Sequence, residues 1–177
     1  MAPISIMTAT ELELSLKRIA SEMMEACAAQ RNIALIGVLT CGEPLARRLA
    51  GHIEEMEGIS PPLGALDIGV HRDDGGHPTE GRGSGPTLID FDLTDRRVFL
   101  VDDVFFTGRT ARAAIDAVME LGRPRKIWLA ALIDRGHREL PFRPDFIGKN
   151  VPTSLAEHIR VRMREVDGED GVWLLKR

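Results

Sequence analysis

The 177-residue sequence contains two cysteines and no apolar run long enough to span a membrane. Cys27 and Cys41 are too few and too widely placed for a disulfide framework, so both are expected to be free thiols. The first residues, MAPISIMTATELE, lack the basic start and the apolar stretch of a secretory signal. We therefore expect a cytoplasmic protein.

Motifs for a resident metal and for several enzyme classes are also lacking. The five histidines are scattered, without a second histidine or a cysteine at metal-binding spacing, so no structural zinc is expected. No Ser-His-Asp context or paired thiol motif supports a hydrolase or an oxidoreductase. Any metal at the functional site should therefore arrive with a ligand instead of being held by the protein alone.

Positive charge is in deficit, because 23 Lys and Arg residues stand against 27 Asp and Glu, giving a net charge of −4. This balance argues against indiscriminate binding of nucleic acid. Residues 122–149 nevertheless hold seven basic and three acidic residues, so this segment alone carries +4. A local basic face is compatible with an acidic protein.

Residues 98–110, VFLVDDVFFTGRT, are the most informative stretch of the sequence. An apolar strand over 98–101 is followed by a tight loop and by a helix expected to begin at Arg109. Gly108 lets the backbone approach a ligand closely, and Thr107 and Thr110 supply hydroxyls. The free N–H groups at the helix start point at a bound anion, so the pattern predicts a phosphate cradle.

Asp102 and Asp103 end the strand and are suited to a different part of the ligand. Neither carboxylate is expected to contact the phosphate, because like charges repel. Carboxylates in this place accept hydrogen bonds from sugar hydroxyls, or hold Mg²⁺ that the phosphates also bind. The alternative, a buried strand end with an acidic helix cap, would need one acid and no second threonine. The ligand indicated is a phosphorylated ribose.

The remaining pattern alternates strands and helices within one expected domain, residues 1–177. A capping box is expected at Thr10 and Glu13, ahead of apolar residues at helical spacing up to Cys27. The other expected elements are strands over 33–39, 63–71, 98–101 and 127–133, helices over 44–57 and 109–121, and a C-terminal hairpin over 158–177. This alternation predicts a parallel α/β sheet with ligands at the carboxyl ends of its strands.

Two further loops are candidates for ligand contact. Thr40-Cys41-Gly42 follows the first buried strand and precedes a helix, which suits binding of pyrophosphate through backbone N–H groups. Residues 72–86 contain five glycines, two prolines and no large apolar residue. A loop of this length inside a compact domain is either functional or disordered.

The strand, the two acids and the Thr-Gly-x-Thr loop of residues 98–110 resemble the type I phosphoribosyltransferase family. The resemblance implies a mainly parallel twisted sheet flanked by helices, a flexible lid hairpin over 72–86 and a small hood built by 158–177. It implies Mg²⁺ bound together with phosphoribosyl pyrophosphate (PRPP). It also gives catalytic roles to Asp102, Asp103 and Arg72, the last reaching the pyrophosphate. Cys41 stands where the family has arginine, so activity should be weak.

Residues 134–154, DRGHRELPFRPDFIGKNVPTS, resemble the diagnostic segment of the PyrR family of pyrimidine-operon regulators. That resemblance implies conversion of uracil and PRPP to UMP, UMP-responsive binding of pyrimidine-operon (pyr) mRNA leader RNA, and a homodimer or higher homo-oligomer. The residues implied for PRPP and UMP are Thr40, Cys41, Gly42, Asp102, Asp103, Val104, Phe105, Phe106, Thr107, Gly108, Arg109, Thr110 and Arg135. Those implied for RNA are Arg138, Arg143 and Lys149. The alternative is a purely metabolic phosphoribosyltransferase for uracil or a purine base.

Overall fold

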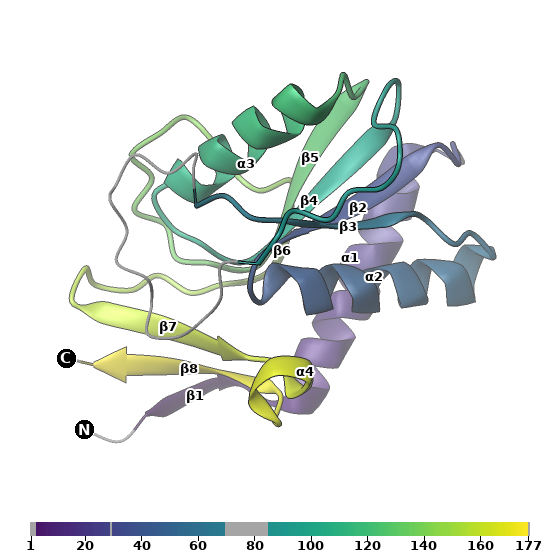
Figure 1. Cartoon of the computed structure of the whole chain (residues 1–177). Coiled ribbons are helices and arrows are strands. Elements are labelled where there is room, and N and C mark those ends of the chain that lie inside the picture. Colours follow the sequence, from purple (N-terminus) through teal and green to yellow (C-terminus); the bar gives the residue numbers. More distant parts are fainter. Residues whose placement is uncertain (1–2, 29, 70–84, 177) are drawn as a thin grey trace.

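The computed structural model describes residues 3–28, 30–69 and 85–176, which form two sheets and four helices (Figure 1). In chain order the elements are β1 (Ile4–Met7), α1 (Ala9–Cys27), β2 (Ile33–Val38), α2 (Gly42–Glu57), β3 (Leu63–Leu66), β4 (Arg97–Phe105), α3 (Arg109–Leu121), β5 (Lys126–Asp134), β6 (Phe146–Asn150), β7 (Glu157–Arg162), α4 (Arg164–Asp167) and β8 (Gly171–Lys176). In these described ranges no helix is long and apolar enough to cross a membrane.

The larger sheet has the strand order β3-β2-β4-β5-β6 and is parallel throughout. Helix α3 covers one face, and α1 and α2 cover the other (Figure 1). All six residues of β2 are buried, as expected of a strand that packs against helices on both sides. Beneath α1, Phe99 of β4 stacks on Trp128 of β5 with ring centres 4.8 Å apart. The predicted α/β fold with a parallel sheet and flanking helices is confirmed.

The smaller sheet, which we call the hood, contains β1, β8 and β7 in that order, all antiparallel. The predicted C-terminal hairpin is therefore present, but its first strand ends at Arg162 because residues 164–167 turn into α4. Strand β1 was not predicted, and it brings the N-terminal end of the chain beside the C-terminal end (Figure 1). Sequence gave no signal for it, because four residues are too few to show a period.

A salt-bridge network fastens the hood to α2. The Arg48 guanidinium donates to both carboxylate oxygens of Glu165 at 2.8 and 2.7 Å, and to those of Asp170 at 3.1 and 2.7 Å. Asp170 is nearly buried, with 8% of its side chain exposed. The two acids follow Arg48 by more than 110 residues, so this network links parts of the chain that are far apart in the sequence.

The predicted start of the first helix was wrong by two residues. The capping box is formed by Thr8 and Glu11, whose side chains bond each other's backbone amides, while Thr10 lies inside α1. Both pairs have the same three-residue spacing, so the sequence alone did not discriminate between them. Thr8 has extended backbone angles at the end of β1, which makes it the cap. Helix α2 likewise begins at Gly42, two residues before Pro44.

Two strand boundaries also differ from the prediction. Strand β3 ends at Leu66, five residues early, because Asp67 turns the chain by accepting a hydrogen bond from the Gly69 amide at 2.8 Å. Strand β4 runs to Phe105, four residues beyond the expected end, since it stays paired with β5 up to Phe105 and Asp134. Strand β6 was not predicted at all. Most of the lid expected over 72–86 lies outside the described residues.

Candidate functional site

The predicted phosphate cradle lies where β4 ends and α3 begins. Gly108 caps α3 with φ of 92°, a left-handed conformation that favours glycine and explains its place in the loop. The amides of Thr110 and Ala111 have no hydrogen-bond acceptor within the described part of the chain. Helix geometry directs such amides toward the N-terminal end, where they attract an anion.

A cavity of ≈ 290 Å³ opens at this point, close to the lower end of the roughly 300–1,000 Å³ typical of small-molecule sites. The residues that line it come from the predicted segment, with two additions, Ala111 and Glu139: Asp102, Val104, Phe105, Phe106, Thr107, Gly108, Arg109, Thr110, Ala111 and Glu139. The structure therefore brings the expected loop residues together around one space.

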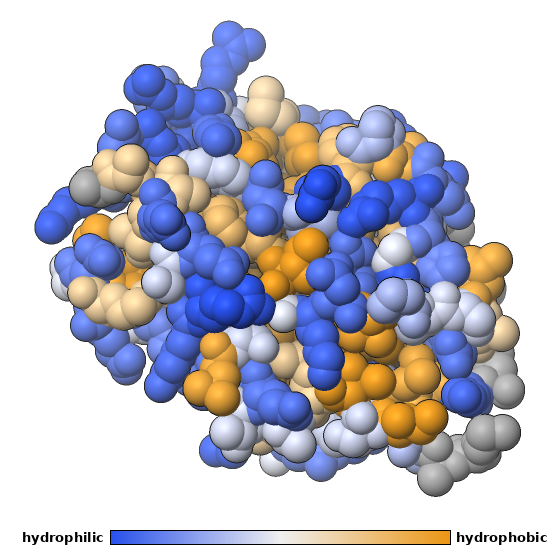
Figure 2. Space-filling model, turned by 180° about the vertical axis from the view of Figure 1, so that it is seen from behind, coloured by the Kyte–Doolittle hydropathy of each residue, from blue (hydrophilic) through white to orange (hydrophobic). Residues whose placement is uncertain are grey.

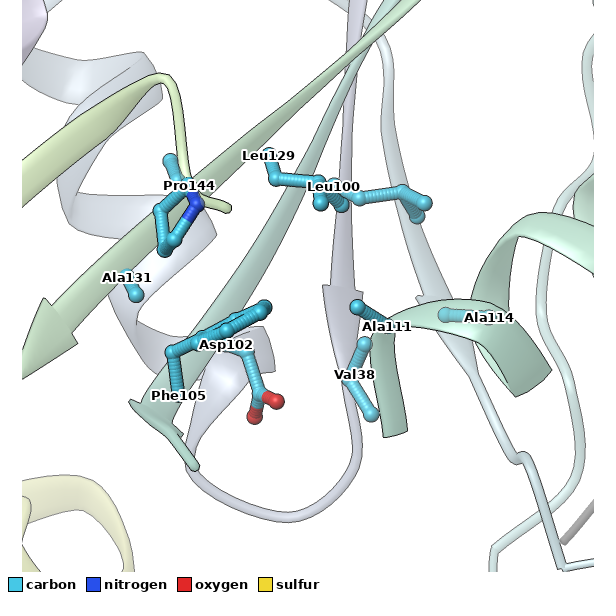
Figure 3. Close-up of a pocket in the computed structure, with 10 residues that line it drawn as sticks. Val38, Leu100, Asp102, Phe105, Ala111, Ala114, Leu129, Ala131 and Pro144 are labelled. Atoms are coloured by element: carbon cyan, nitrogen blue, oxygen red, sulfur yellow. The ribbon is translucent and has the colours of Figure 1, made fainter. Parts of the chain in front are cut away.

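The two acids of the motif lie on the strand itself, so their side chains leave it in opposite directions. Asp102 is on the α3 side of the sheet, beside the cavity, whereas Asp103 is not among the residues that line it. Figure 3 shows the Asp102 carboxylate pointing away from the apolar Leu100 and Leu129. The gap between these side chains and α3 measures only ≈ 10 Å³, room for about one water molecule, so the space for a ligand is the larger cavity at the β4–α3 loop.

Backbone amides orient both carboxylates. The Asp103 amide donates to Asp102 Oδ1 at 2.9 Å, and the Val104 amide donates to Asp103 Oδ1 at 2.8 Å. No cluster of three or more His, Cys, Asp or Glu side chains able to hold a metal occurs in residues 3–28, 30–69 and 85–176. The Asp102 carboxylate beside the cavity fits a Mg²⁺ that takes its other oxygen ligands from a phosphorylated substrate and water.

The Thr40-Cys41-Gly42 loop reaches the same end of the sheet. A Cβ on Gly42 would lie 2.4 Å from the carbonyl oxygen of Val101, so only glycine allows α2 to begin this close to β4. The peptide bond between Leu39 and Thr40 is cis. Cys41 precedes α2 with its side chain only 3% exposed, packed in the apolar cluster beneath the sheet. Its backbone is therefore better placed than its thiol to meet a ligand.

Arg135 was predicted to contact PRPP or UMP, but it lies buried, 6% exposed. Its Nε donates to Thr153 Oγ1 at 3.0 Å, and its Nη2 donates to the carbonyl oxygens of Ser154 and Glu157 at 3.4 and 2.5 Å. Burial lowers the pKa of Arg135, while the nearby Glu157 raises it. These contacts join the end of β5 to the start of the hood.

The three residues predicted for RNA are all exposed, but two have internal partners. Arg138 donates to Asp134 Oδ2 at 2.5 Å, and Lys149 Nζ donates to the Ile6 carbonyl of β1 at 2.8 Å. Arg143 has no hydrogen bond or ion pair in the described part of the chain. The remaining predicted site residue, Arg72, lies outside the described residues.

Besides Ala111 in the first turn of α3, Glu139 is the cavity residue that sequence reasoning missed. Its Oε2 accepts a hydrogen bond from Arg109 Nε at 2.9 Å, across 30 positions of sequence. The one signal in the sequence was its place in the segment 134–154, where we predicted functional roles for basic residues only.

Comparison with known proteins agrees with this geometry. The family model of the phosphoribosyl transferase domain matches residues 5–159. The bifunctional protein PyrR of Thermus thermophilus is 53% identical over 175 residues, which cover 97% of this chain and 95% of that protein. The bifunctional protein PyrR of Deinococcus radiodurans is 50% identical over 170 residues, covering 96% and 93%.

Solved structures show the same fold at much lower identity. A hypoxanthine-guanine phosphoribosyltransferase from Bacillus anthracis superposes with a TM-score of 0.71 at 18% identity, covering 98% of this chain and 97% of that one. A hypoxanthine phosphoribosyltransferase from Staphylococcus aureus gives 0.71 at 15% identity, covering 98% and 91%. At such identities the likeness concerns the fold alone.

Proposed function

Because this chain belongs to the phosphoribosyltransferase family, and within it to the PyrR proteins, we propose that it transfers phosphoribosyl from PRPP to uracil. The products are UMP and pyrophosphate. The observation that carries the proposal is the cradle at the β4–α3 junction, where a carboxylate and helix amides with no acceptor among the described residues line one cavity. A phosphate and a ribose need these two kinds of partner side by side.

Each part of the ligand has a suitable partner in this arrangement. The 5′-phosphate accepts hydrogen bonds from the first amides of α3 and from the hydroxyls of Thr107 and Thr110. The ribose hydroxyls donate to the Asp102 carboxylate beside the cavity, with Asp103 as a second acceptor expected from the family resemblance alone. The amides of residues 40–42 face the pyrophosphate, with Arg72 as an additional cation expected from the family resemblance alone.

The reaction breaks the bond between C1 of the ribose and pyrophosphate while the uracil nitrogen forms a new bond to C1 and loses its proton to solvent. Positive charge develops on the ribose and negative charge on the departing pyrophosphate. Bound Mg²⁺ would neutralise part of that negative charge. Asp102 holds the sugar through its hydroxyls, and the negative charges of Asp102 and Asp103 favour the cationic ribose.

We extend the proposal to regulation, in which the same site senses UMP and the protein binds the leader of pyrimidine-operon mRNA. Support comes from the exposed Arg138, Arg143 and Lys149, all in or beside the segment that precedes the hood. On a chain of net charge −4, RNA binding must depend on a few cations and on shape.

A homo-oligomer completes the proposal. The rear face mixes polar and apolar residues, and apolar areas gather toward its lower part (Figure 2). Large apolar side chains with exposed fractions of 45% and 61% occur at Ile4 of β1 and Leu14 of α1. Light scattering during gel filtration, with and without UMP, measures the oligomeric state.

Two assays test the function. PRPP consumption is measured with uracil, hypoxanthine, guanine and orotate in parallel, and we expect turnover with uracil alone. Turnover with hypoxanthine or guanine in place of uracil would show that the substrate is a purine base and that the assignment of uracil is wrong. Filter binding then compares the leader RNA with a scrambled RNA of equal length, with and without UMP. Equal affinity for both RNAs would reduce the proposal to a metabolic enzyme.

A further inference from the structure

Glu139 presents a physical problem, since this acidic residue and the helix amides proposed to bind a phosphate line the same cavity. We propose that the Arg109–Glu139 pair couples nucleotide binding to RNA binding, by changing partners when a phosphate enters the cradle. This inference rests on the proposed function and names the contact through which the nucleotide site acts on the basic segment 137–143, called here the strap.

Hydrogen bonds make the cradle and the strap one mechanical unit. The amides of Glu139 and Leu140 both donate to the Thr107 carbonyl, at 3.0 and 3.2 Å. Just before the strap, the Arg135 amide donates to the Phe105 carbonyl at 3.0 Å. A shift of the loop on ligand binding is therefore passed directly to the strap backbone.

Packing adds to these bonds. A Cβ built on Gly108 would lie 3.4 Å from Leu140 Cβ and 3.7 Å from Phe142 Cβ, so strap side chains rest on the residue that caps α3. The strap also displays Arg138 and Arg143, two of the cations proposed to meet RNA. The phosphate site and the RNA face are thus separated by a single layer of contacts.

Charge decides which partner Arg109 takes. A nucleotide phosphate carries about −1.5 to −2 charges at neutral pH, whereas the Glu139 carboxylate carries one. The pair is open to solvent, with 38% of the Arg109 side chain and 54% of the Glu139 side chain exposed, and so exposed an ion pair contributes little free energy. An entering phosphate repels Glu139 and attracts Arg109, so the Arg109–Glu139 ion pair breaks. We call the strap without this ion pair the released strap.

Coupling of this kind is reciprocal, so RNA that prefers the released strap must also tighten UMP binding. In the wild type we expect UMP to raise affinity for the leader RNA about fivefold or more, the lower end of typical coupling. Glu139→Gln removes the carboxylate charge while keeping the shape. Its affinity for UMP without RNA should rise several-fold, and its RNA affinity without UMP should approach the wild-type value with UMP.

The measurement is a complete binding cycle: calorimetry of UMP with and without RNA, and filter binding of RNA with and without UMP. Glu169→Gln is the matched control, because Glu169 pairs with Arg162 in the hood, away from the cradle. The exposed side-chain fractions are similar, 50% for Glu169 and 39% for Arg162. The coupling ratio is the RNA affinity with UMP divided by the RNA affinity without UMP. We expect this ratio to be below about twofold in Glu139→Gln and to be unchanged from the wild type in Glu169→Gln.

Failure of this inference is distinguishable from failure of the proposed function. A wild type that binds neither UMP nor leader RNA would refute the function. If the wild type couples the two ligands and Glu139→Gln couples them equally, the inference is overturned. It is also overturned if Glu139→Gln binds UMP more weakly than the wild type, because Glu139 would then be a ligand of the nucleotide.

Discussion

The guanidinium carbon of Arg135 lies 4.1 Å from the centre of the Phe106 ring, stacked on the residue that follows β4. This contact joins the candidate site to the hood, because the same guanidinium donates to the hydroxyl of Thr153 and to backbone carbonyls near β7. Only arginine provides a planar group that stacks on a ring and donates in several directions at once.

Arg135→Lys should therefore lower the free energy of unfolding by about 1 to 3 kcal/mol, the worth of the charged hydrogen bonds that lysine cannot reproduce. Urea unfolding followed by circular dichroism measures this, with the exposed Arg143→Lys as control. Equal midpoints for the two variants would show that the buried contacts add no stability.

The Arg48 network should make stability depend on acid pH. Hydrogen bonds from Arg48 lower the pKa of Glu165. Burial raises the pKa of Asp170, but hydrogen bonds from Arg48 and from the Arg164 amide outweigh it, so the net shift is also downward. Groups with depressed folded-state pKa values stabilise the fold above the unfolded pKa of about 4, and this contribution is lost as pH falls further.

Arg48→Met should cost about 2 to 4 kcal/mol at neutral pH and flatten the loss of stability below about pH 4. Arg47→Met is the control, because Arg47 is 65% exposed and pairs with Glu43 of its own helix. Thermal unfolding from pH 7 to pH 2.5 measures both variants. Parallel pH curves for Arg48→Met and the wild type would contradict the prediction.

The acids of β4 should bind the ribose. Asp102→Asn should weaken PRPP and UMP binding by about 1.5 to 3 kcal/mol, the worth of a hydrogen bond to a charged group, because Asp102 is the acid that lines the cavity. Thr110→Ala should weaken both ligands as well, since it removes a hydroxyl beside the α3 amides. Calorimetry measures these affinities, with Asp116→Asn on the exposed part of α3 as control. Unchanged affinity in both site variants would refute the site assignment.

Cys41→Arg should lower KM for PRPP and raise turnover, because a guanidinium meets pyrophosphate oxygens in a bidentate way that a thiol cannot. The thiol is buried in an apolar cluster, so the longer side chain must turn outward and the melting temperature should fall. Initial-rate kinetics and thermal unfolding measure the two effects, with Cys41→Ala as a neutral control. A folded Cys41→Arg variant with unchanged KM would show that the loop binds through its backbone alone.

Arg143 and Lys149 should contribute differently to RNA binding. The slope of log affinity against log salt concentration is negative. Each substitution by alanine should reduce the magnitude of this slope by about 0.7 if the contacted RNA is single-stranded. Lys149→Ala should in addition loosen β1, since it removes the hydrogen bond to the Ile6 carbonyl. Salt titrations by filter binding, with Arg47→Ala as control, measure the slopes. Identical slopes in all three variants would exclude these residues from the RNA face.

Sequence by itself determined the local parts of this protein. The cradle follows from neighbours in the chain: Gly108 in a left-handed conformation, an apolar strand before it, and a helix whose bounds, Arg109–Leu121, were predicted to the residue. Turn chemistry and helical spacing act over a few residues, so they can be read without a structure. The same holds for the parallel α/β arrangement, since buried strands alternate with amphipathic helices.

Tertiary structure decided the contacts between distant positions. It placed Glu139 against Arg109, buried Arg135 under Phe106, and tied Lys149 to Ile6 across 143 positions. It also extended β4 past the two acids, because pairing with β5 continued beyond the apolar run. A charge pattern states which residues are basic, but only packing decides whether a cation meets solvent, a ring or a carbonyl.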